Sequence, residues 1–310
     1  MTTLPQLTGD DLYLTDGGLE TALVFLEGLD LPDFAAFPLL DDRDGRAALD
    51  RYYAPYLDLA ERIGAGFVLD TPTWRANRDW GKRLGYDDAA LGEVNQRAVD
   101  YIRGLADERP ALTTVLNGVV GPRGDGYVVG EVMTSQDAAA YHSLQARAFA
   151  AAGAQMMTAV TMTYVAEAIG IADAATAEGL PVVISFTTET DGRLPSGQEL
   201  GEAIAEVDEA TDGSPAYFMV NCAHPTHFAG SLVEGSSWLE RVKAVRANAS
   251  KKSHAELNEA EELDRGDVAG LARHYGELRR ILPDMRVAGG CCGTDDAHIS
   301  AIAEELSRPT

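Results

Sequence analysis

Cysteine is scarce in this chain of 310 residues, which has three: Cys222, Cys291 and Cys292. The number is odd and two of the three are neighbours, whereas a secreted domain held by disulfides carries an even set at wider spacings. Adjacent cysteines rarely bridge each other, because the geometry is strained. The sequence therefore argues against a disulfide framework and predicts free thiols in a reducing cytoplasm.

Basic residues and long apolar runs are scarce as well. The chain has 25 Lys and Arg against 49 Asp and Glu, a formal net charge of -24 at pH 7. Such a surface repels nucleic acid and anionic lipid, so we expect neither as a partner. No stretch reaches the ~18–20 apolar residues of a membrane span, and the polar N-terminal segment is unlike a signal peptide. We expect a cytoplasmic protein that binds small molecules, with the oligomeric state left open, a homo-oligomer included.

What the chain does have is a regular alternation of short apolar runs and helical patterns. Strands are expected at 12–15, 66–71, 112–117, 155–161, 181–186, 216–222, 241–248 and 285–290. Helical spacing of apolar residues predicts helices at 47–63, 135–152 and 296–306, and Thr294 and Asp295 offer an N-cap for the last. No repeat and no Pro/Ser-rich linker divides the chain, which predicts a single domain over residues 1–310.

Eight buried strands separated by helices predict an α/β protein of the (β/α)8 barrel type. The runs are continuously apolar, as parallel strands covered on both faces are. A doubly wound sheet is the alternative, but no GxGxxG turn follows the first run. In a barrel the active site lies at the carboxyl ends of the strands.

Chemically active residues stand at four of these expected strand ends: Asp16, Asn117, Asn221 with Cys222, and Cys291 with Cys292. The sixth and eighth strands are two strand spacings apart, about 10 Å, so their cysteines can meet at one metal ion. Three thiolates with one position left over are typical of catalytic zinc, and soft sulfur selects zinc over magnesium or calcium. The alternative is that the three are buried structural cysteines. It is weaker for the GGCCG segment, because glycines let the backbone turn both sulfurs toward one point.

Four stretches of sequence, taken together, resemble a known family. They are TDGGLET (15–21), GVVGPRGDGY (118–127), NCAHP (221–225) and GGCCGTDDAHI (289–299). In this order they are similar to the homocysteine S-methyltransferases, which include betaine- and S-methylmethionine-dependent enzymes. The resemblance implies a (β/α)8 barrel that holds zinc through Cys222, Cys291 and Cys292. It also implies that the fourth zinc position accepts the thiol of homocysteine.

The resemblance further implies an enzyme of methionine biosynthesis. Its reaction would move a methyl group from a sulfonium or ammonium donor, such as S-methylmethionine, to homocysteine and so give methionine. Zinc deprotonates a thiol that binds to it, so no general base and no catalytic side chain beyond the zinc-activated substrate thiol is expected.

The expected substrate-binding residues are Asp16, Gly17, Gly18, Glu20, Trp74, Asn117 and Asn221. Asp16 matches the family's motif near the amino-acid substrate, where it would hold an ammonium group or else cap a turn. Glu20 would add a second carboxylate or serve as an ordinary first-turn acid. Trp74 would face the methyl-bearing cation or simply pack. Asn221 would orient the metal site or make a strand-end hydrogen bond.

One position departs from the family pattern. Relatives carry an acidic residue at the end of the fourth strand, where this chain has Val160. Glu20 or Glu167 would compensate, or the acceptor is a different thiol. The alternative function, which Val160 favours, is a zinc- or thiol-binding barrel that has lost methyl transfer. A zinc hydrolase is disfavoured, because three thiolates make the metal a poor Lewis acid for activating water.

Overall fold

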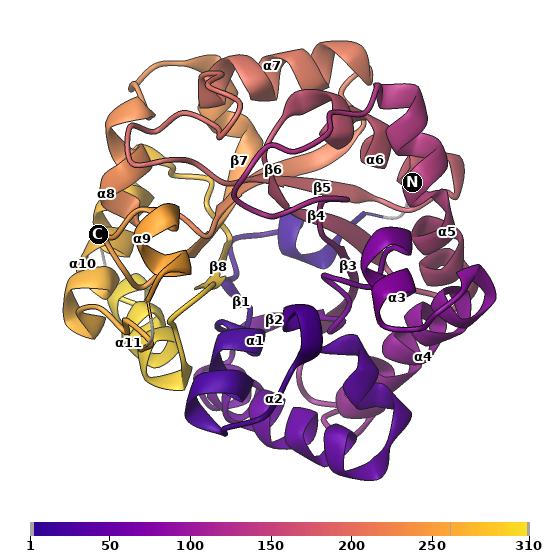
Figure 1. Ribbon diagram of the computed structural model, residues 1–310. Coiled ribbons are helices and arrows are strands. Elements are labelled where there is room, and N and C mark those ends of the chain that lie inside the picture. Colours follow the sequence, from indigo (N-terminus) through magenta and orange to yellow (C-terminus); the bar gives the residue numbers. More distant parts are fainter. Residues whose placement is uncertain (1–2, 261, 309–310) are drawn as a thin grey trace.

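A closed barrel of eight parallel strands forms the centre of the computed structural model, which describes residues 3–260 and 262–308. Each strand pairs with its neighbours in sequence, and β1 closes the barrel against β8 (Figure 1). The strands are β1 Tyr13–Leu14, β2 Gly66–Asp70, β3 Thr114–Val120, β4 Met156–Met162, β5 Val182–Phe186, β6 Pro215–Asn221, β7 Val242–Ala247 and β8 Val287–Gly290. The predicted (β/α)8 barrel is confirmed.

Helices form the outer ring of the barrel (Figure 1). The long ones are α2 Arg43–Ile63, α4 Asp88–Asp107, α5 Ser135–Ala151, α6 Val165–Ala177, α7 Leu200–Ala210, α10 Val268–Ile281 and α11 Asp296–Leu306. Short helices lie in the loops at the strand ends: α1 Leu19–Thr21, α3 Arg78–Arg83, α8 Pro225–Phe228 and α9 His254–Asn258. Between β6 and β7 the chain forms only α8 and short 3-10 segments. Among the described residues, none of the helices combines the length and apolar character needed to cross a membrane.

Local sequence signals explain where the helices begin and end. The side chain of Asp42 accepts a hydrogen bond from the amide of Gly45 and so caps the first turn of α2. The same helix ends at Gly64, whose φ of 70° is the left-handed conformation that glycine adopts without strain. At the other end of the chain, Asp295 caps α11 by accepting from the amide of His298, as the sequence predicted.

Two apolar layers hold the barrel together. The larger one lies between the strands and the helices, and the smaller one fills the barrel interior. The interior layer consists of Leu4, Tyr13, Val68, Val115, Val119, Met156, Val160, Val183, Tyr217, Met219, Ala244 and Val287. At the amino-terminal end of the barrel, Gln6 donates a hydrogen bond to the hydroxyl of Tyr217 at 3.3 Å. The barrel is therefore packed shut at this end, and its polar groups gather at the other.

The third strand differs most from the sequence prediction. It was expected to end at Asn117, but β3 runs on to Val120. Gly118 lies within the strand, and the ring of Phe149 occupies the space that a side chain at this position would need. A Cβ on Gly118 would lie 2.5 Å from Cγ of Phe149. The expectation that Asn117 ends its strand was therefore wrong, and its side chain is buried inside the barrel.

Candidate metal and substrate site

Three thiols meet at the carboxyl end of the barrel. Cys222 follows β6, and Cys291 with Cys292 follows β8. Their Sγ atoms all lie within 4.8 Å of one another. Tetrahedral zinc with Zn–S bonds of about 2.3 Å holds its sulfurs about 3.8 Å apart, so small side-chain rotations would close this triangle on one ion. The structure thus brings together the three residues that the sequence suggested as ligands.

The backbone around these thiols is unusually tight. Cys222 has a φ of 53°, in the left-handed region that residues other than glycine seldom adopt. Cys291 follows β8, which neighbours β1, and its carbonyl packs against Gly18, where an added Cβ would lie 2.6 Å from that oxygen. Strained backbone of this kind persists where the surrounding structure fixes it, and it concentrates at functional sites. Gly18 of the TDGG segment is therefore required, because a side chain at this position would collide with the backbone of Cys291.

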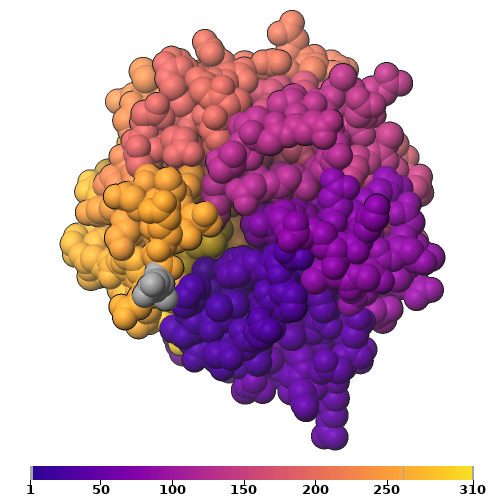
Figure 2. Space-filling model, in the orientation of Figure 1, coloured from indigo at the N-terminus to yellow at the C-terminus, as the bar shows by residue number. Residues whose placement is uncertain are grey.

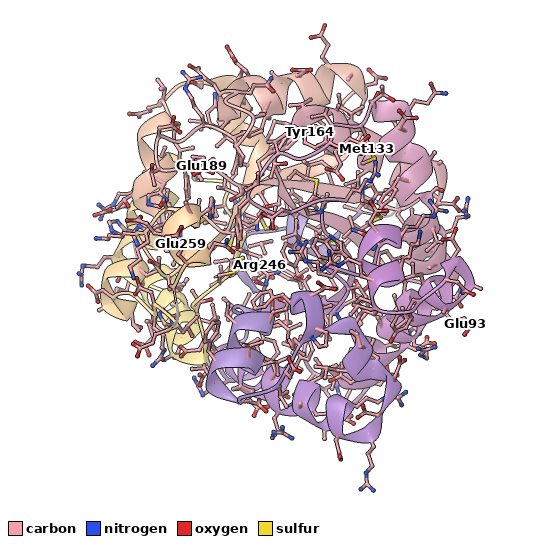
Figure 3. All side chains as sticks on the ribbon, viewed as in Figure 1. Glu93, Met133, Tyr164, Glu189, Arg246 and Glu259 are labelled. Carbon is pink, nitrogen blue, oxygen red and sulfur yellow. The ribbon has the colours of Figure 1, made fainter. Side chains whose placement is uncertain are left out.

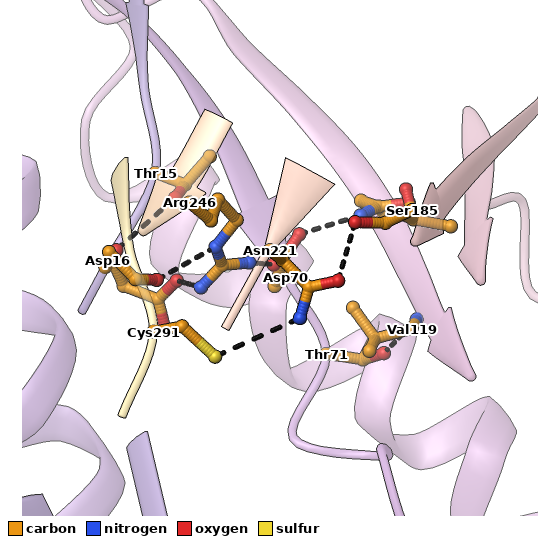
Figure 4. A network of polar contacts seen from close by, with 12 residues as sticks. Thr15, Asp16, Asp70, Thr71, Val119, Ser185, Asn221, Arg246 and Cys291 are labelled. Atoms are coloured by element: carbon orange, nitrogen blue, oxygen red, sulfur yellow. Dashed lines mark hydrogen bonds and ion pairs between the residues drawn. The ribbon is translucent and has the colours of Figure 1, made fainter. Parts of the chain in front are cut away.

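Asn221 ties three strands, β4, β5 and β6, to the thiol cluster (Figure 4). Its Oδ1 accepts from the hydroxyl of Ser185 at 2.5 Å and from the amide of Thr161 at 2.9 Å. Its Nδ2 donates to the hydroxyl of Thr161 at 2.8 Å and points toward Sγ of Cys291 at 3.8 Å. Thr161 itself has a φ of 66°, which Asn221 holds in place from both sides. This arrangement suits the orienting role expected for Asn221 rather than direct contact with a substrate.

Tyr127 also reaches the thiols, although sequence reasoning did not single it out. Its hydroxyl lies 3.0 Å from Sγ of Cys222 and 3.3 Å from Sγ of Cys292. The ring stacks on His254, with 4.1 Å between ring centres, which holds the phenol over the cluster. The only signal in the sequence was the position of Tyr127 at the end of the GVVGPRGDGY stretch.

Hydrogen bonds among the thiols divide the negative charge unevenly. The pKa of Cys291 lies well below its ordinary value, because the thiols of Cys222 and Cys292 donate to it and Arg246 stands nearby. The pKa values of the two donors, Cys222 and Cys292, are raised by the same contacts. The three thiols therefore do not ionise independently, and their mutual contacts favour the ionised form at Cys291.

A buried ion triad of Arg246, Asp16 and Asp70 lies close to Cys291 (Figure 4), and Figure 3 shows Arg246 near the centre of the barrel. Arg246, from β7, points into the barrel, where Nη2 lies 2.5 Å from Oδ1 of Asp16 and Nη1 pairs with Oδ2 of Asp70. The hydroxyl of Tyr52 donates to the other oxygen of Asp16 at 2.9 Å. Asn117 donates to the other oxygen of Asp70 at 2.6 Å. This predicted substrate residue therefore supports the triad.

The triad has two acids for one base, so its charge balance is negative. Burial raises the pKa of Asp16 to about 6; Arg246 opposes this shift and Asp70 adds to it. Sequence reasoning did not identify Arg246, because the seventh strand carried only a weak apolar signal. The signal that could have found it is a charged residue next to the apolar Val245 near the carboxyl end of the run, where a barrel places its functional side chains.

A pocket opens beside Cys291 and Cys292, in the central hollow of the face shown in Figure 2, where the indigo and yellow ends of the chain meet. Five of the seven predicted substrate residues line it: Asp16, Gly17, Gly18, Glu20 and Trp74. Asn117 and Asn221 lie behind the lining, where they contact Asp70 and Cys291 instead. The structure therefore groups the predicted residues into a lining set and a supporting set.

Glu20 and Glu167 were the two acids expected to compensate for the apolar Val160. Glu20 lines the pocket, and Glu167 does not. Val160 lines the pocket with an apolar side chain. Glu167 is buried elsewhere, where its carboxylate accepts from Nε2 of His142 at 3.0 Å and from the amide of Arg123 at 2.7 Å. Burial raises the pKa of Glu20 to about 7, and the thiol of Cys291 adds to the shift. Of the two compensating acids considered from the sequence, only Glu20 is placed to meet a substrate.

Residues 13–306 match the sequence pattern of a family described as homocysteine S-methyltransferase. The chain belongs to the homocysteine S-methyltransferase family. Betaine–homocysteine S-methyltransferase 1 of Rattus norvegicus is 27% identical over 265 residues, which make up 77% of this chain. The match spans 60% of that relative's own length.

Solved structures share the barrel. The homocysteine methyltransferase MmuM of Escherichia coli has a TM-score of 0.75 at 22% identity in its oxidised form. Its metallated form gives 0.73 at 21% identity, and both comparisons cover 96% of each chain. At these identities the likeness shows the fold. The family expected from the sequence is confirmed, and it supports the expected enzyme class, a thiol methyltransferase.

Proposed function

We propose that this chain is a zinc-dependent methyltransferase that moves a methyl group from a sulfonium or ammonium donor to a thiol, most simply to homocysteine. The observation that carries the proposal is the meeting of Cys222, Cys291 and Cys292 beside a pocket at the carboxyl end of the barrel. Family membership supports it, and so does the metallated form of the E. coli enzyme that shares the fold.

The donor set fits zinc. Three soft thiolates favour zinc over hard cations, and three protein ligands leave one tetrahedral position open. In the described part of the chain no other group of three or more His, Cys, Asp or Glu side chains is close enough to hold an ion. When bound, zinc would supply a position in which a substrate thiol loses its proton and becomes nucleophilic at neutral pH. The remaining residues then have the task of holding the two substrates.

Glu20 is the residue best placed to hold the ammonium group of an amino-acid acceptor. Both oxygens of Asp16 are already engaged, one by Arg246 and one by Tyr52. The carboxylate of Glu20 lines the same pocket, and no ion pair joins it to another described residue. We therefore assign to Glu20 the contact that Val160 cannot make.

Replacing Glu20 with glutamine is expected to raise KM for homocysteine about 10- to 100-fold with little change in kcat. A charge-assisted hydrogen bond contributes roughly 1.5–3 kcal/mol, and its loss from the bound acceptor appears in KM. Steady-state rates at saturating donor measure the effect. Glu27→Gln is the matched control, because Glu27 is an exposed acid on the same segment that pairs with Arg51.

The pH dependence of this variant separates binding by charge from a packing role. With a pKa of about 7, Glu20 is mostly protonated at pH 6 and mostly ionised at pH 8, so its attraction for an ammonium group grows as the pH rises. Loss of the thiol proton affects both enzymes alike. The ratio of KM values, variant over wild type, should therefore increase from pH 6 to pH 8. A ratio that stays constant would remove Glu20 from acceptor binding.

The direct test of the proposed function uses the zinc-loaded protein with homocysteine and S-methylmethionine, and methionine is the expected product. A panel of other thiols, tested with sulfonium and ammonium donors, covers a different acceptor. The competing function is a zinc- or thiol-binding barrel without methyl transfer, which the apolar Val160 in the pocket favours. Stoichiometric zinc without methylation of any thiol would establish that alternative.

A further inference from the structure

A strap, which we define as residues 121–134, joins β3 to α5 at the carboxyl end of the barrel. Its middle carries Tyr127, whose hydroxyl lies 3.0 Å from Sγ of Cys222 and 3.3 Å from Sγ of Cys292. These thiols follow β6 and β8, so the strap holds its tyrosine well away from its own strand. Whatever fixes the two ends of the strap therefore helps to decide where the hydroxyl lies.

The first turn of α6 binds the strap at both ends. Near the first end, Oε1 of Glu167 accepts a hydrogen bond from the backbone amide of Arg123 at 2.7 Å. Near the second end, the hydroxyl of Tyr164 accepts from the backbone amide of Met133 at 3.2 Å, and both residues are labelled in Figure 3. Burial raises the pKa of Tyr164 to about 12, and the neighbouring carboxylate of Glu167 adds to this shift. Tyr164 and Glu167 thus act as two jaws of one clasp.

Glu167 is itself held by a histidine of the preceding helix. Its Oε1 lies 3.0 Å from Nε2 of His142, and the two side chains are 1% and 0% exposed. On the other side of the ring, Nδ1 of His142 lies 3.4 Å from Oε1 of Gln145. A buried pair of this kind is weak evidence for stability, because apolar side chains of similar size often replace it without loss. Its effect here is geometric, since it presents the carboxylate to the strap.

Between its anchors, the second half of the strap is exposed. Val128 and Val132 are 67% and 58% exposed, whereas Met133 at the clasp is only 6% exposed. The ring of Tyr127 stacks on His254 with 4.1 Å between ring centres. This stacking limits the tilt of the ring, while the reach of the hydroxyl toward the thiols depends on the backbone of the strap.

Building on the zinc site of the proposed function, we infer that Glu167 and Tyr164 are positioning residues of the metal centre. They clasp the strap so that the hydroxyl of Tyr127 donates a hydrogen bond to the sulfurs that bind the ion. A sulfur that binds zinc has lost its proton, so the phenol is then the donor. The donated bond stabilises the thiolate form, which is the form that binds the metal.

Zinc affinity, measured by competition with a chelator, tests this inference. Tyr127→Phe should weaken it about 10- to 100-fold, the usual effect of losing a hydrogen-bond partner of metal ligands. Tyr164→Phe and Glu167→Gln should each weaken it about 2- to 10-fold, the range of one neutral hydrogen bond. Two controls should keep wild-type affinity. Tyr101→Phe loses a hydroxyl contact with Asp50, and Glu277→Gln loses an exposed contact with His274.

Double variants distinguish positioning from a general loss of stability. If the clasp acts through Tyr127, Tyr164→Phe and Glu167→Gln should have almost no effect on zinc affinity once Tyr127→Phe is present. The same fold-loss in both backgrounds would refute the inference. Tyr164→Phe removes a single oxygen atom, so this comparison is available even if Glu167→Gln does not fold.

A second measurement separates a failure of the clasp from a failure of the proposed function. Wild-type protein that binds no zinc would refute the zinc-dependent function. Hydrogen–deuterium exchange of the protein as purified tests the clasp without relying on the metal. Tyr164→Phe should speed exchange of residues 121–134 several-fold, and Tyr101→Phe should leave it unchanged. Unchanged exchange in Tyr164→Phe would refute the clasp, even in a protein that binds zinc and transfers methyl groups.

Discussion

Replacing Cys291 with alanine is expected to reduce bound zinc from about one ion per chain to nearly none and to lower methyl transfer by at least ~10³-fold. The two thiols that remain after the replacement cannot build a three-sulfur site. Metal analysis of the purified variant and its initial rate with homocysteine measure the two effects. Cys222→Ala should behave in the same way, which tests whether β6 and β8 share one ion.

A neighbouring histidine supplies the control for the cysteine variants. His227 lies five residues after Cys222, but its Nε2 contacts the carbonyl of Lys251 at 2.9 Å instead of the cluster. His227→Ala should therefore keep its zinc. If Cys291→Ala retained one tightly bound zinc per chain, the assignment of the three thiols as ligands would be wrong.

Replacing Arg246 with methionine is expected to lower the free energy of unfolding by about 3–5 kcal/mol at pH 8, the usual cost of leaving a buried ionic partner alone. The variant retains the buried carboxylates of Asp16 and Asp70 with no cation between them. Burial already raises the pKa of Asp16 to about 6, and loss of Arg246 would raise it further, so the destabilisation should shrink as the pH falls and this carboxylate takes up a proton. Urea unfolding at pH 8 and at pH 5.5 measures the effect and its sign.

Two further variants separate the buried triad from ordinary surface pairing. Asp70→Asn, added to Arg246→Met, removes one of the two stranded charges and should recover part of the lost stability. Arg51→Met breaks the exposed pair with Glu27 and should change the free energy of unfolding by no more than about 1 kcal/mol. An Arg246→Met protein as stable as the Arg51→Met protein at pH 8 would contradict the role given to the triad.

The barrel was predictable because its signal is local. Buried parallel strands read as continuous apolar runs, and each expected run coincides with an observed strand to within a few residues. The position of the thiol cluster was predictable from the barrel, because Cys222 and Cys291 stand at strand ends that must converge once the barrel closes. The end of β3 was missed: the strand runs past the expected end at Asn117 to Val120, through Gly118, whose lack of a side chain leaves room for the ring of Phe149.

The polar side chains that complete the site could not be predicted in this way. The contacts of Arg246 with Asp16 and Asp70 join residues more than 170 positions apart, and no local pattern records them. Tyr127 looks like a loop aromatic until the barrel places its hydroxyl beside the thiols. The sequence therefore indicated the metal half of the site, while the substrate half depends on long-range contacts.

The central claim is that three cysteines hold zinc and leave its fourth position to the acceptor sulfur. Zinc K-edge X-ray absorption on the zinc-loaded protein, before and after addition of homocysteine, tests this claim directly. We expect three sulfur ligands and one lighter ligand at rest, and four sulfurs at about 2.3 Å once the thiol is bound. A resting shell with fewer than three sulfurs, or a shell that saturating homocysteine leaves unchanged, would contradict it.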